Sequence, residues 1–296
     1  MNNTVLIINS AASRAHKHTN ALKKRATKLG IKKIIVTNPD TFKPELVKAL
    51  KQKPKHLVIG GGDGTVISGI DVAHNKNYAG SFGIIPLGTS NYFARNLRIS
   101  LMPSKALRQS LKGKHIGIHL AEANKHLFAL MADIGASVHI SQHVTYDQKK
   151  RFGQLAYLLS TFKALKTHSP FGYSLVYDNE QKLEGFCHNI LVVNSSLNEQ
   201  VRLAPDNNLR KDSLTVSIYT GKSNAVLLLN VILYIVTFSK FKRGIKEFNA
   251  KKIEINTLPK REFSVDGEVK TKTPVKIKLL DTKTVIATPK IKQSSA

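Results

Sequence analysis

The chain has 296 residues, of which 42% are hydrophobic and 22% charged, so its composition excludes a disordered protein and leaves room for two domains. The 46 lysine and arginine residues outnumber the 19 acidic residues and give a formal net charge of +27. This excess favours nucleic acid, an anionic membrane surface or nucleotide phosphates as partners, although solvated lysines of an ordinary basic protein explain it equally well. The single cysteine, Cys187, excludes a disulfide framework and a thiolate metal site.

Neither a signal peptide nor a membrane-spanning helix is predicted. The N-terminal stretch "MNNTVLIINSAAS" has no basic segment and only a short apolar run. The longest apolar run, residues 225–238, is shorter than the roughly 20 residues that cross a bilayer, and it contains Asn230. We therefore expect a cytosolic setting.

Strand and helix signals alternate in the first third of the chain. Apolar runs bounded by glycine or polar residues predict strands at residues 4–9, 32–37, 56–61 and 82–88. Helices are predicted at residues 14–29, stopped by Gly30, and at residues 41–52, with Pro44 near the start. This alternation predicts an α/β domain with a doubly wound parallel sheet.

Beyond about Gly117 short strands follow one another with few helices. A strand pair with a turn near Asn124 is expected, then a second pair with a polar turn at "DNEQ". Further strands are predicted at residues 213–220, 251–256, 262–269 and 275–280, and helices at residues 152–166 and 224–242. This pattern predicts a mainly antiparallel β second domain. We place the domains at residues 1–118 and 119–274, and the C-terminal strand in about 275–296 can return to the first domain.

The stretch "VIGGGDGTVISG" places glycines where a strand ends and a helix should begin. Gly61, Gly62 and Gly64 let the backbone turn sharply and present N–H groups to a phosphate. Asp63 would repel a bare phosphate, so it makes sense beside a metal ion or a hydroxyl. The alternative is a tight turn in which Asp63 caps the helix.

A second loop, "PLGTSNYFARNL", repeats this arrangement after the next strand. Gly88 is followed by Thr89, Ser90 and Asn91, which open a helix. Ends of adjacent parallel strands converge on one crevice, so two such loops favour a polyphosphate site. Neither loop is a Walker A motif or a GxGxxG fingerprint.

Together, "GGDGT" and "PLGTSNYFARNL" resemble the diacylglycerol-kinase catalytic family, which includes sphingosine kinases and bacterial lipid kinases. The blocks "LFALMADIGASV", "RLAPDNNLRKDSLTVSIY" and "FSVDGEV" extend the resemblance along nearly the whole chain. It implies an ATP-binding first domain, a lipid-binding β-rich second domain, and transfer of the γ-phosphate of ATP to a diacylglycerol-like or sphingoid-like hydroxyl with Mg²⁺. It also implies a lipid substrate and a cytoplasmic enzyme, peripheral at the anionic inner face of the membrane.

The resemblance also assigns residues. Glu268 is implied as the proton acceptor, with Asp266 beside it and Asp63 completing the catalytic set, and a carboxylate suits the removal of a lipid hydroxyl's proton. For "VDGEV" alone the alternative is a plain hairpin turn. The implied Mg²⁺ site joins the Asp212 carboxylate to carbonyl oxygens of Leu209 and Leu214. The implied nucleotide-binding residues are Asn9, Thr37, Gly61, Gly62, Asp63, Gly64, Thr65, Gly88, Thr89 and Asn91.

Four departures from the family pattern keep alternatives open, among them "SAASR" after Asn9 and "NEQV" before "RLAP", where the family has glycines. Tyr92 stands where many relatives have an acid or amide, and His119 where many have an aspartate. A non-catalytic nucleotide- or lipid-binding member is therefore an alternative. An NAD kinase is another, because its relatives share the GGDGT loop, although "PLGTSNYFARNL" and the terminal "DGE" favour a lipid kinase. We expect no nucleic-acid partner, because RNP-like, zinc-finger and basic-repeat motifs are absent. A homodimer is left open.

Two features of the sequence could serve other roles. The histidine pairs 115/119 and 139/143 have metal-like spacing, but solvated histidines are the better explanation. The apolar segment 225–238, followed by a basic stretch, suits either an interfacial helix or a buried one.

Overall fold

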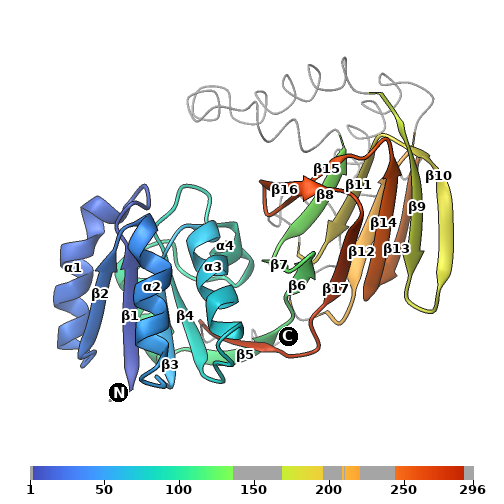
Figure 1. Ribbon diagram of the computed structural model, residues 1–296. Helices are drawn as coiled ribbons and strands as arrows, with labels where there is room; N and C mark the ends of the chain where they lie inside the picture. Colours follow the sequence, from blue (N-terminus) through green and yellow to red (C-terminus); the bar gives the residue numbers. More distant parts are fainter. Residues whose placement is uncertain (1–2, 136–168, 196–208, 210, 221–243, 290–296) are drawn as a thin grey trace, which may run out of the picture. The chain divides into compact units, whose positions relative to one another are not determined.

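The computed structural model describes residues 3–135, 169–195, 209, 211–220 and 244–289. The chain divides into two compact units, here called the first unit (residues 1–118 and 282–296) and the second unit (residues 119–281). Figure 1 shows the elements of each. None of the helices in the described ranges combines the length and apolar character that crossing a bilayer requires.

The first unit is built on a six-stranded sheet in the order β2-β1-β3-β4-β18-β5 (Figure 1). Strands β1 to β4 and β18 run parallel, and β5 pairs antiparallel with β18. The central strands are buried along nearly their whole length, as in sheets covered on both faces. Their bounds are β1 (Thr4–Asn9), β2 (Lys33–Thr37), β3 (His56–Gly61), β4 (Ser81–Pro86), β5 (Lys114–Ile118) and β18 (Thr284–Thr288).

Helices cover both faces of this sheet, which confirms the predicted doubly wound architecture. The chain steps from β1 to β2 in one direction and from β3 to β4 in the other, so right-handed crossovers place α1 and α3 on opposite faces. Helix α1 packs against α5, and α2 packs against α3. The helices are α1 (Ala15–Lys28), α2 (Pro39–Leu50), α3 (Asp63–His74), α4 (Tyr92–Asn96) and α5 (Pro103–Lys112).

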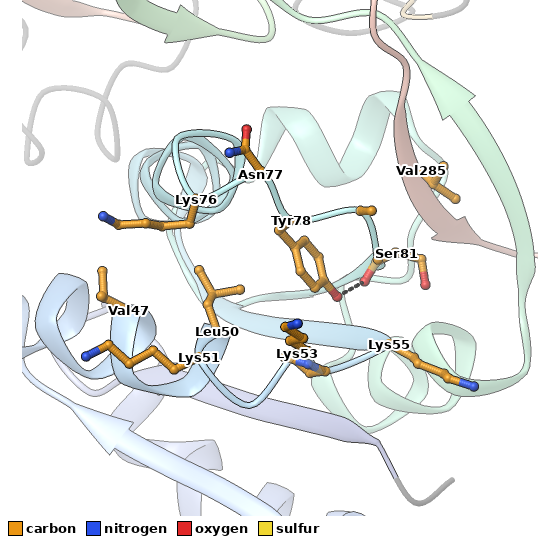
Figure 2. Close-up of a pocket in the computed structure, with 13 residues that line it drawn as sticks. Val47, Leu50, Lys51, Lys53, Lys55, Lys76, Asn77, Tyr78, Ser81 and Val285 are labelled. Carbon is orange, nitrogen blue, oxygen red and sulfur yellow. Dashed lines mark hydrogen bonds between the residues drawn. The ribbon is translucent and has the colours of Figure 1, made fainter.

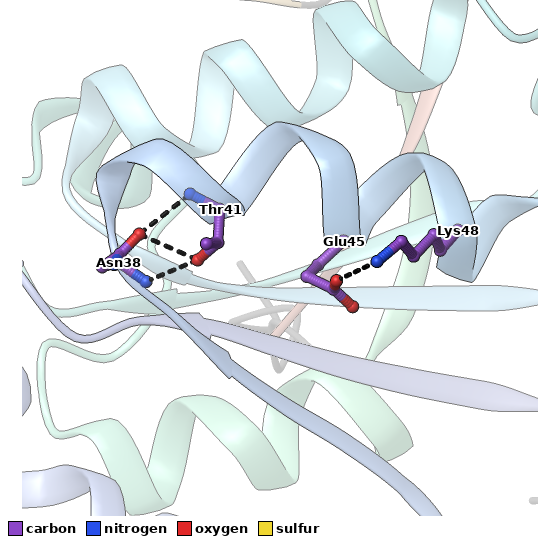
Figure 3. A network of polar contacts seen from close by, with 4 residues as sticks. All are labelled: Asn38, Thr41, Glu45 and Lys48. Atoms are coloured by element: carbon purple, nitrogen blue, oxygen red, sulfur yellow. Dashed lines mark hydrogen bonds and ion pairs between the residues drawn. The ribbon is translucent and has the colours of Figure 1, made fainter.

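Helix α2 begins two residues before the predicted start at residue 41. Asn38 forms a capping box: its Oδ1 accepts from Thr41 N (2.8 Å), and Thr41 Oγ1 accepts from Asn38 N (3.1 Å) (Figure 3). Pro39 occupies the first helical position, where its missing N–H costs nothing. Pro44, which we expected near the helix start, therefore lies inside the helix.

The second unit consists of two antiparallel six-stranded sheets, β10-β9-β14-β17-β6-β7 and β13-β12-β11-β8-β15-β16 (Figure 1). Apolar side chains from both sheets form one buried cluster, which contains Phe128, Phe171 and Phe263. This arrangement confirms the predicted antiparallel domain. The strands are β6 (Ala121–Ala123), β7 (His126–Phe128), β8 (Met131–Gly135), β9 (Phe171–Tyr177), β10 (Gln181–Cys187), β11 (Asn189–Val193), β12 (Leu214–Tyr219), β13 (Ile245–Ala250), β14 (Lys252–Leu258), β15 (Glu262–Val265), β16 (Glu268–Lys272) and β17 (Val275–Leu279).

The last two strands belong to different units. Strand β17 pairs with β14 and β6 in the second unit, whereas β18 pairs with β4 and β5 in the first. The chain thus returns to the first unit between Leu279 and Thr284, later than residue 275. The predicted helices at residues 152–166 and 224–242 and the histidine pair 139/143 lie outside the described residues.

His56, at the start of β3, gives the first unit a pH-dependent stability. Its Nδ1 lies 2.8 Å from Ser81 Oγ, and its ring packs edge-on against His115. Burial, followed by the nearby His115, lowers the pKa of His56 from 6.5 to about 4. In this range the unfolded chain binds the proton more readily, so the stabilising contribution is complete above pH 6.5 and is lost as the pH falls through 4.

We expect the free energy of unfolding to fall on the order of 3 kcal/mol more between pH 7 and pH 4 in the wild type than in His56→Gln. Urea unfolding across this pH range measures the difference. His16→Gln, at an exposed position of α1, should keep the wild-type pH dependence. Identical slopes for the wild type and His56→Gln would show that this histidine does not titrate abnormally.

Candidate functional site

The predicted nucleotide-binding residues all lie at, or just after, the carboxyl ends of the first four strands. Asn9 ends β1, Thr37 ends β2, residues 61–65 follow β3, and residues 88–91 follow β4. The chain reverses its direction of travel across the sheet between β1 and β3, and ligands of such sheets bind at this reversal point. The Asn9 side chain spans it, because Nδ2 donates to Thr65 Oγ1 (3.2 Å).

The first glycine loop leads directly into the N-terminus of α3. Gly62 occupies the N-cap position with an extended backbone, and no side chain caps the helix. The first intrahelical bond is donated by Val66 N to Gly62 O (3.0 Å). The N–H groups before Val66 therefore have no partner inside the helix, and at a helix N-terminus such groups attract anions.

Asp63 connects the two glycine loops. Its Oδ2 accepts from Tyr92 N (2.9 Å) and its Oδ1 from Phe93 N (3.0 Å), the first two N–H groups of α4. Burial raises the pKa of the Asp63 carboxyl, and these two backbone N–H groups oppose that shift. The carboxylate thus caps α4 instead of α3, and both of its oxygens accept bonds from the protein itself.

Asn91 closes the second glycine loop on itself. Its backbone is left-handed (φ 50°, ψ 44°) and only 3% of the residue is exposed. Its Oδ1 accepts from Gly88 N (2.9 Å), and its Nδ2 donates to Gly88 O (2.6 Å). The side-chain amide is therefore used inside the loop, whereas Thr89 next to it is exposed.

The two glycine loops touch through their backbones. A Cβ atom on Gly88 would lie 2.6 Å from the Cα of Gly62, a distance that no real Cβ atom tolerates. Gly61 is equally restricted, because a Cβ there would lie 2.6 Å from the Thr65 side chain. Glycine at position 88 lets the two loops pack against one another, and glycine at position 61 leaves room for the Thr65 side chain.

The loop after β1, "SAASR", is the third part of this edge. Asn9 Oδ1 accepts from Ala11 N (3.1 Å), and Arg14 N donates to Leu87 O (2.9 Å). Ser13 Oγ lies 3.2 Å from Thr89 Oγ1, which places two hydroxyls side by side. The sequence did not single out Ser13, because its neighbour Thr89 lies 76 residues away in the chain.

Thr37 has an internal role in this structure. It is buried, and its Oγ1 donates to Ile8 O (3.2 Å). Its carbonyl accepts from both the backbone N–H and the hydroxyl of Ser10 (2.8 Å each). Thr37 thus holds the loop after β1 in place.

In the second unit the Asp-Gly turn forms the hairpin between β15 and β16. Asp266 (φ 48°) and Gly267 (φ 85°) both have left-handed backbones, as a two-residue type I′ turn requires. The Asp266 carboxylate accepts three backbone N–H groups, from Ala129, Leu130 and Met131 (2.9–3.0 Å). Asp266 therefore anchors the hairpin to the connection between β7 and β8.

Glu268, the next acid along the hairpin, has very different surroundings. Its side chain is 65% exposed, and its Oε2 pairs with Lys270 Nζ at 2.7 Å. The Glu268 carboxylate is therefore exposed, whereas the Asp266 carboxylate belongs to a partly buried residue and accepts three backbone hydrogen bonds.

The predicted Mg²⁺ ligands lie just before β12 and at its first residue. The Asp212 carboxylate is 62% exposed and forms an ion pair with Lys251. The carbonyl of Leu209 accepts from His119 N (2.7 Å), and Leu214 is the first residue of β12. One carboxylate and two carbonyls suit a Mg²⁺ ion that keeps several waters. Within the described ranges no group of three His, Cys, Asp or Glu side chains forms a stronger metal site.

Two of the residues that depart from the family pattern, Tyr92 and His119, are integrated into the fold. Tyr92 supplies its backbone N–H to Asp63 (2.9 Å), and its carbonyl accepts from Asn96 Nδ2 (3.1 Å). His119 is buried, and its Nδ1 lies 3.1 Å from Leu280 O, which makes it the donor. The carbonyl of His119 accepts from Asn194 Nδ2 (3.0 Å).

Comparison with known families matches both units. Residues 3–123 match the diacylglycerol kinase catalytic domain, and residues 131–287 match the YegS C-terminal NAD kinase beta sandwich-like domain. A Staphylococcus carnosus protein named "Putative lipid kinase" is 26% identical over 226 residues, which are 75% of this chain and 73% of that protein. A protein of Staphylococcus aureus with the same description is 26% identical over 227 residues, 76% of this chain and 74% of its own length.

Solved structures support the fold. A "putative diacylglycerol kinase" from Bacillus anthracis superposes with a TM-score of 0.80 and 24% identity, covering 97% of this chain and 95% of that one. A second structure, titled a diacylglycerol kinase and from the same organism, gives a TM-score of 0.79 at 22% identity, covering 97% and 96%. The two family matches together extend over nearly the whole chain, which therefore belongs to the diacylglycerol kinase catalytic-domain family and is a phosphotransferase of the lipid kinase class.

Proposed function

We propose that this lipid kinase transfers the γ-phosphate of ATP to the hydroxyl of a diacylglycerol-like or sphingoid-like lipid, with Mg²⁺. The observation that carries the proposal is the backbone contact between the two glycine loops at the reversal point of the first unit's sheet. Phosphoryl transfer depends mainly on positioning and on cancelling charge on the phosphate oxygens. A preformed edge of N–H groups and hydroxyls is suited to that task.

The nucleotide would bind through the backbone of the glycine loops and through hydroxyls beside them. The N–H groups at the start of α3 and the exposed Thr89 and Ser13 hydroxyls supply donors. Asp63 would contribute indirectly, because its carboxylate holds the N-terminus of α4 against the first loop. Asn91 and Thr37 would likewise shape the loops and leave direct phosphate contact to other groups.

Glu268 would act as the general base in the second unit. A lipid hydroxyl is a weak acid, and a carboxylate within hydrogen-bonding distance removes its proton as the new P–O bond forms. Glu268 is the exposed acid of the β15–β16 hairpin, and Lys270 holds its carboxylate by one oxygen. Asp266 would fix the hairpin, and with it the position of Glu268.

Bound Mg²⁺ would neutralise charge on the phosphate oxygens. Asp212 would hold it through its carboxylate, with carbonyl oxygens of Leu209 and Leu214 and with water. Lys251 would have to release Asp212, and the exposure of both side chains allows this exchange. We further propose peripheral attachment to an anionic membrane face, which the net charge of +27 would favour.

Transfer of labelled γ-phosphate from ATP into a bacterial lipid extract tests the proposal. We expect a labelled lipid with Mg²⁺ and none with EDTA. Parallel reactions with purified diacylglycerol, sphingosine and NAD identify the acceptor. Label in NAD alone would favour the NAD kinase alternative, which the description of the matched C-terminal domain keeps open. ATP binding without any labelled product would favour a binding-only protein.

A further inference from the structure

A pocket lies at the amino ends of the strands in the first unit's sheet, opposite the glycine loops. It has a volume of about 760 Å³, within the usual range of ligand sites. Its walls come from the end of α2, the turn before β3, the turn between α3 and β4, and Val285 of β18 (Figure 2). Strand β3 has six residues, so the amino and carboxyl edges are about 17 Å apart and the pocket is separate from the glycine loops.

The pocket is strongly cationic. Its lining contains no aspartate or glutamate. Within the described part of the chain, no carboxylate forms an ion pair with a lysine that lines the pocket. By contrast Lys48 of α2, which does not line the pocket, pairs with Glu45 at 2.6 Å (Figure 3). Figure 2 shows Leu50 and the Tyr78 ring in the middle of the lining residues, with Lys53 beside the ring and the exposed side chains of the other lysines extending outward from it. The four lysines are Lys51, Lys53, Lys55 and Lys76.

The frame beneath these lysines is held by hydrogen bonds and close packing. The Tyr78 hydroxyl donates to Ser81 O (3.0 Å), and its ring packs edge-on against Phe82 (Figure 2). Gly80 is required beside it, since a Cβ there would lie 2.4 Å from the Tyr78 ring and 2.7 Å from Lys55 O. The turn before β3 is fixed in turn, because Lys55 N donates to Asn3 O (2.9 Å).

Stabilisation of helix C-termini explains only part of this charge. Lys51 is the C-cap of α2, and Lys76 follows the C-cap of α3 by one residue, where a cation is favourable. Lys53 and Lys55 lie beyond the helix end, in the turn that leads into β3. Four lysines and no carboxylate line this concavity, so an anion bound there would be attracted to all four charges.

We propose that this pocket, called here the lysine pocket, binds a phosphate-bearing anion with an apolar portion. The phosphate would lie among the ammonium groups, and the apolar portion would lie on Val47, Leu50 and the Tyr78 ring. Lysine is a flexible point charge, so recognition would depend on charge more than on a fixed hydrogen-bond geometry. A lipid head group and a soluble phosphate compound share this chemistry. The site lies outside the phosphotransfer machinery and does not depend on the proposed function.

Binding to the full-length protein without ATP tests the proposal in two arms. Calorimetry with sodium tripolyphosphate probes a soluble phosphate, and sedimentation with phosphatidylglycerol vesicles, against neutral phosphatidylcholine vesicles, probes a head group. The pocket variant is Lys53→Gln/Lys55→Gln/Lys76→Gln. The matched control, Lys23→Gln/Lys24→Gln/Lys28→Gln on the exposed face of α1, removes the same charge elsewhere. A cooperative thermal unfolding transition is the check that each variant is folded.

We expect the pocket variant to weaken binding at least tenfold in one arm, and the control variant less than twofold. Loss in the calorimetric arm alone assigns a soluble phosphate compound, and loss in the vesicle arm alone assigns a lipid head group. An equal loss in both variants would overturn the proposal, because net charge alone would then account for binding. Unchanged binding in the pocket variant would overturn it as well.

Discussion

Replacing Glu268 by glutamine is expected to lower kcat for lipid phosphorylation by about 10²- to 10⁴-fold, the usual contribution of a positioned base. Glutamine keeps the size of the side chain but cannot take the proton of the lipid hydroxyl. The Glu268 side chain is 65% exposed and pairs with Lys270, so the substitution should not unfold the hairpin. Nucleotide affinity should stay within twofold, because the hydrogen bonds that shape the glycine loops do not involve Glu268.

Single-turnover transfer of labelled phosphate, together with equilibrium binding of a non-hydrolysable ATP analogue, separates these two effects. Glu262→Gln is the matched control, because Glu262 lies on the partner strand of the same hairpin. It should retain activity within about threefold. Full activity of Glu268→Gln would exclude this glutamate as the general base, and another group would then have to accept the proton.

The fold class and the location of the candidate nucleotide site could be predicted because their signals are local. Short apolar runs that end in glycine mark β3 and β4 directly in the sequence. Parallel strands then bring their carboxyl ends to one edge without any further information. The Asp-Gly hairpin was equally readable, since the left-handed turn at Asp266 and Gly267 needs these residue types.

The roles of individual side chains could not be predicted, because they depend on contacts between distant parts of the chain. Asp63 accepts from N–H groups 29 and 30 residues away, and Asp266 from N–H groups 135 to 137 residues away. The sequence predicted catalytic roles for both acids. In the structure, both carboxylates accept hydrogen bonds from backbone N–H groups and hold distant segments together. Strand β13 was missed for a different reason. Apolar and polar residues do not alternate in "IKEFNA", and the burial of these residues does not alternate either, so the two-residue repeat that predicts a strand is absent.

The second large effect is expected at Gly88. Its backbone is not left-handed, so alanine could adopt the same dihedral angles, and only the contact with Gly62 excludes a side chain. A methyl group 2.6 Å from the Gly62 Cα must push the two glycine loops apart. That movement would strain the two bonds between Gly88 and Asn91 and those from α4 to Asp63.

Gly88→Ala should therefore weaken binding of an ATP analogue at least tenfold and lower the free energy of unfolding by about 1–3 kcal/mol, the usual cost of overpacking. Calorimetric titration and urea unfolding measure the two quantities. Gly172→Ala is the control, because a Cβ there would meet its nearest neighbour at an ordinary 3.5 Å. Normal nucleotide binding by Gly88→Ala would mean that the phosphates do not depend on this backbone contact, and the nucleotide site would then have to lie away from the paired loops.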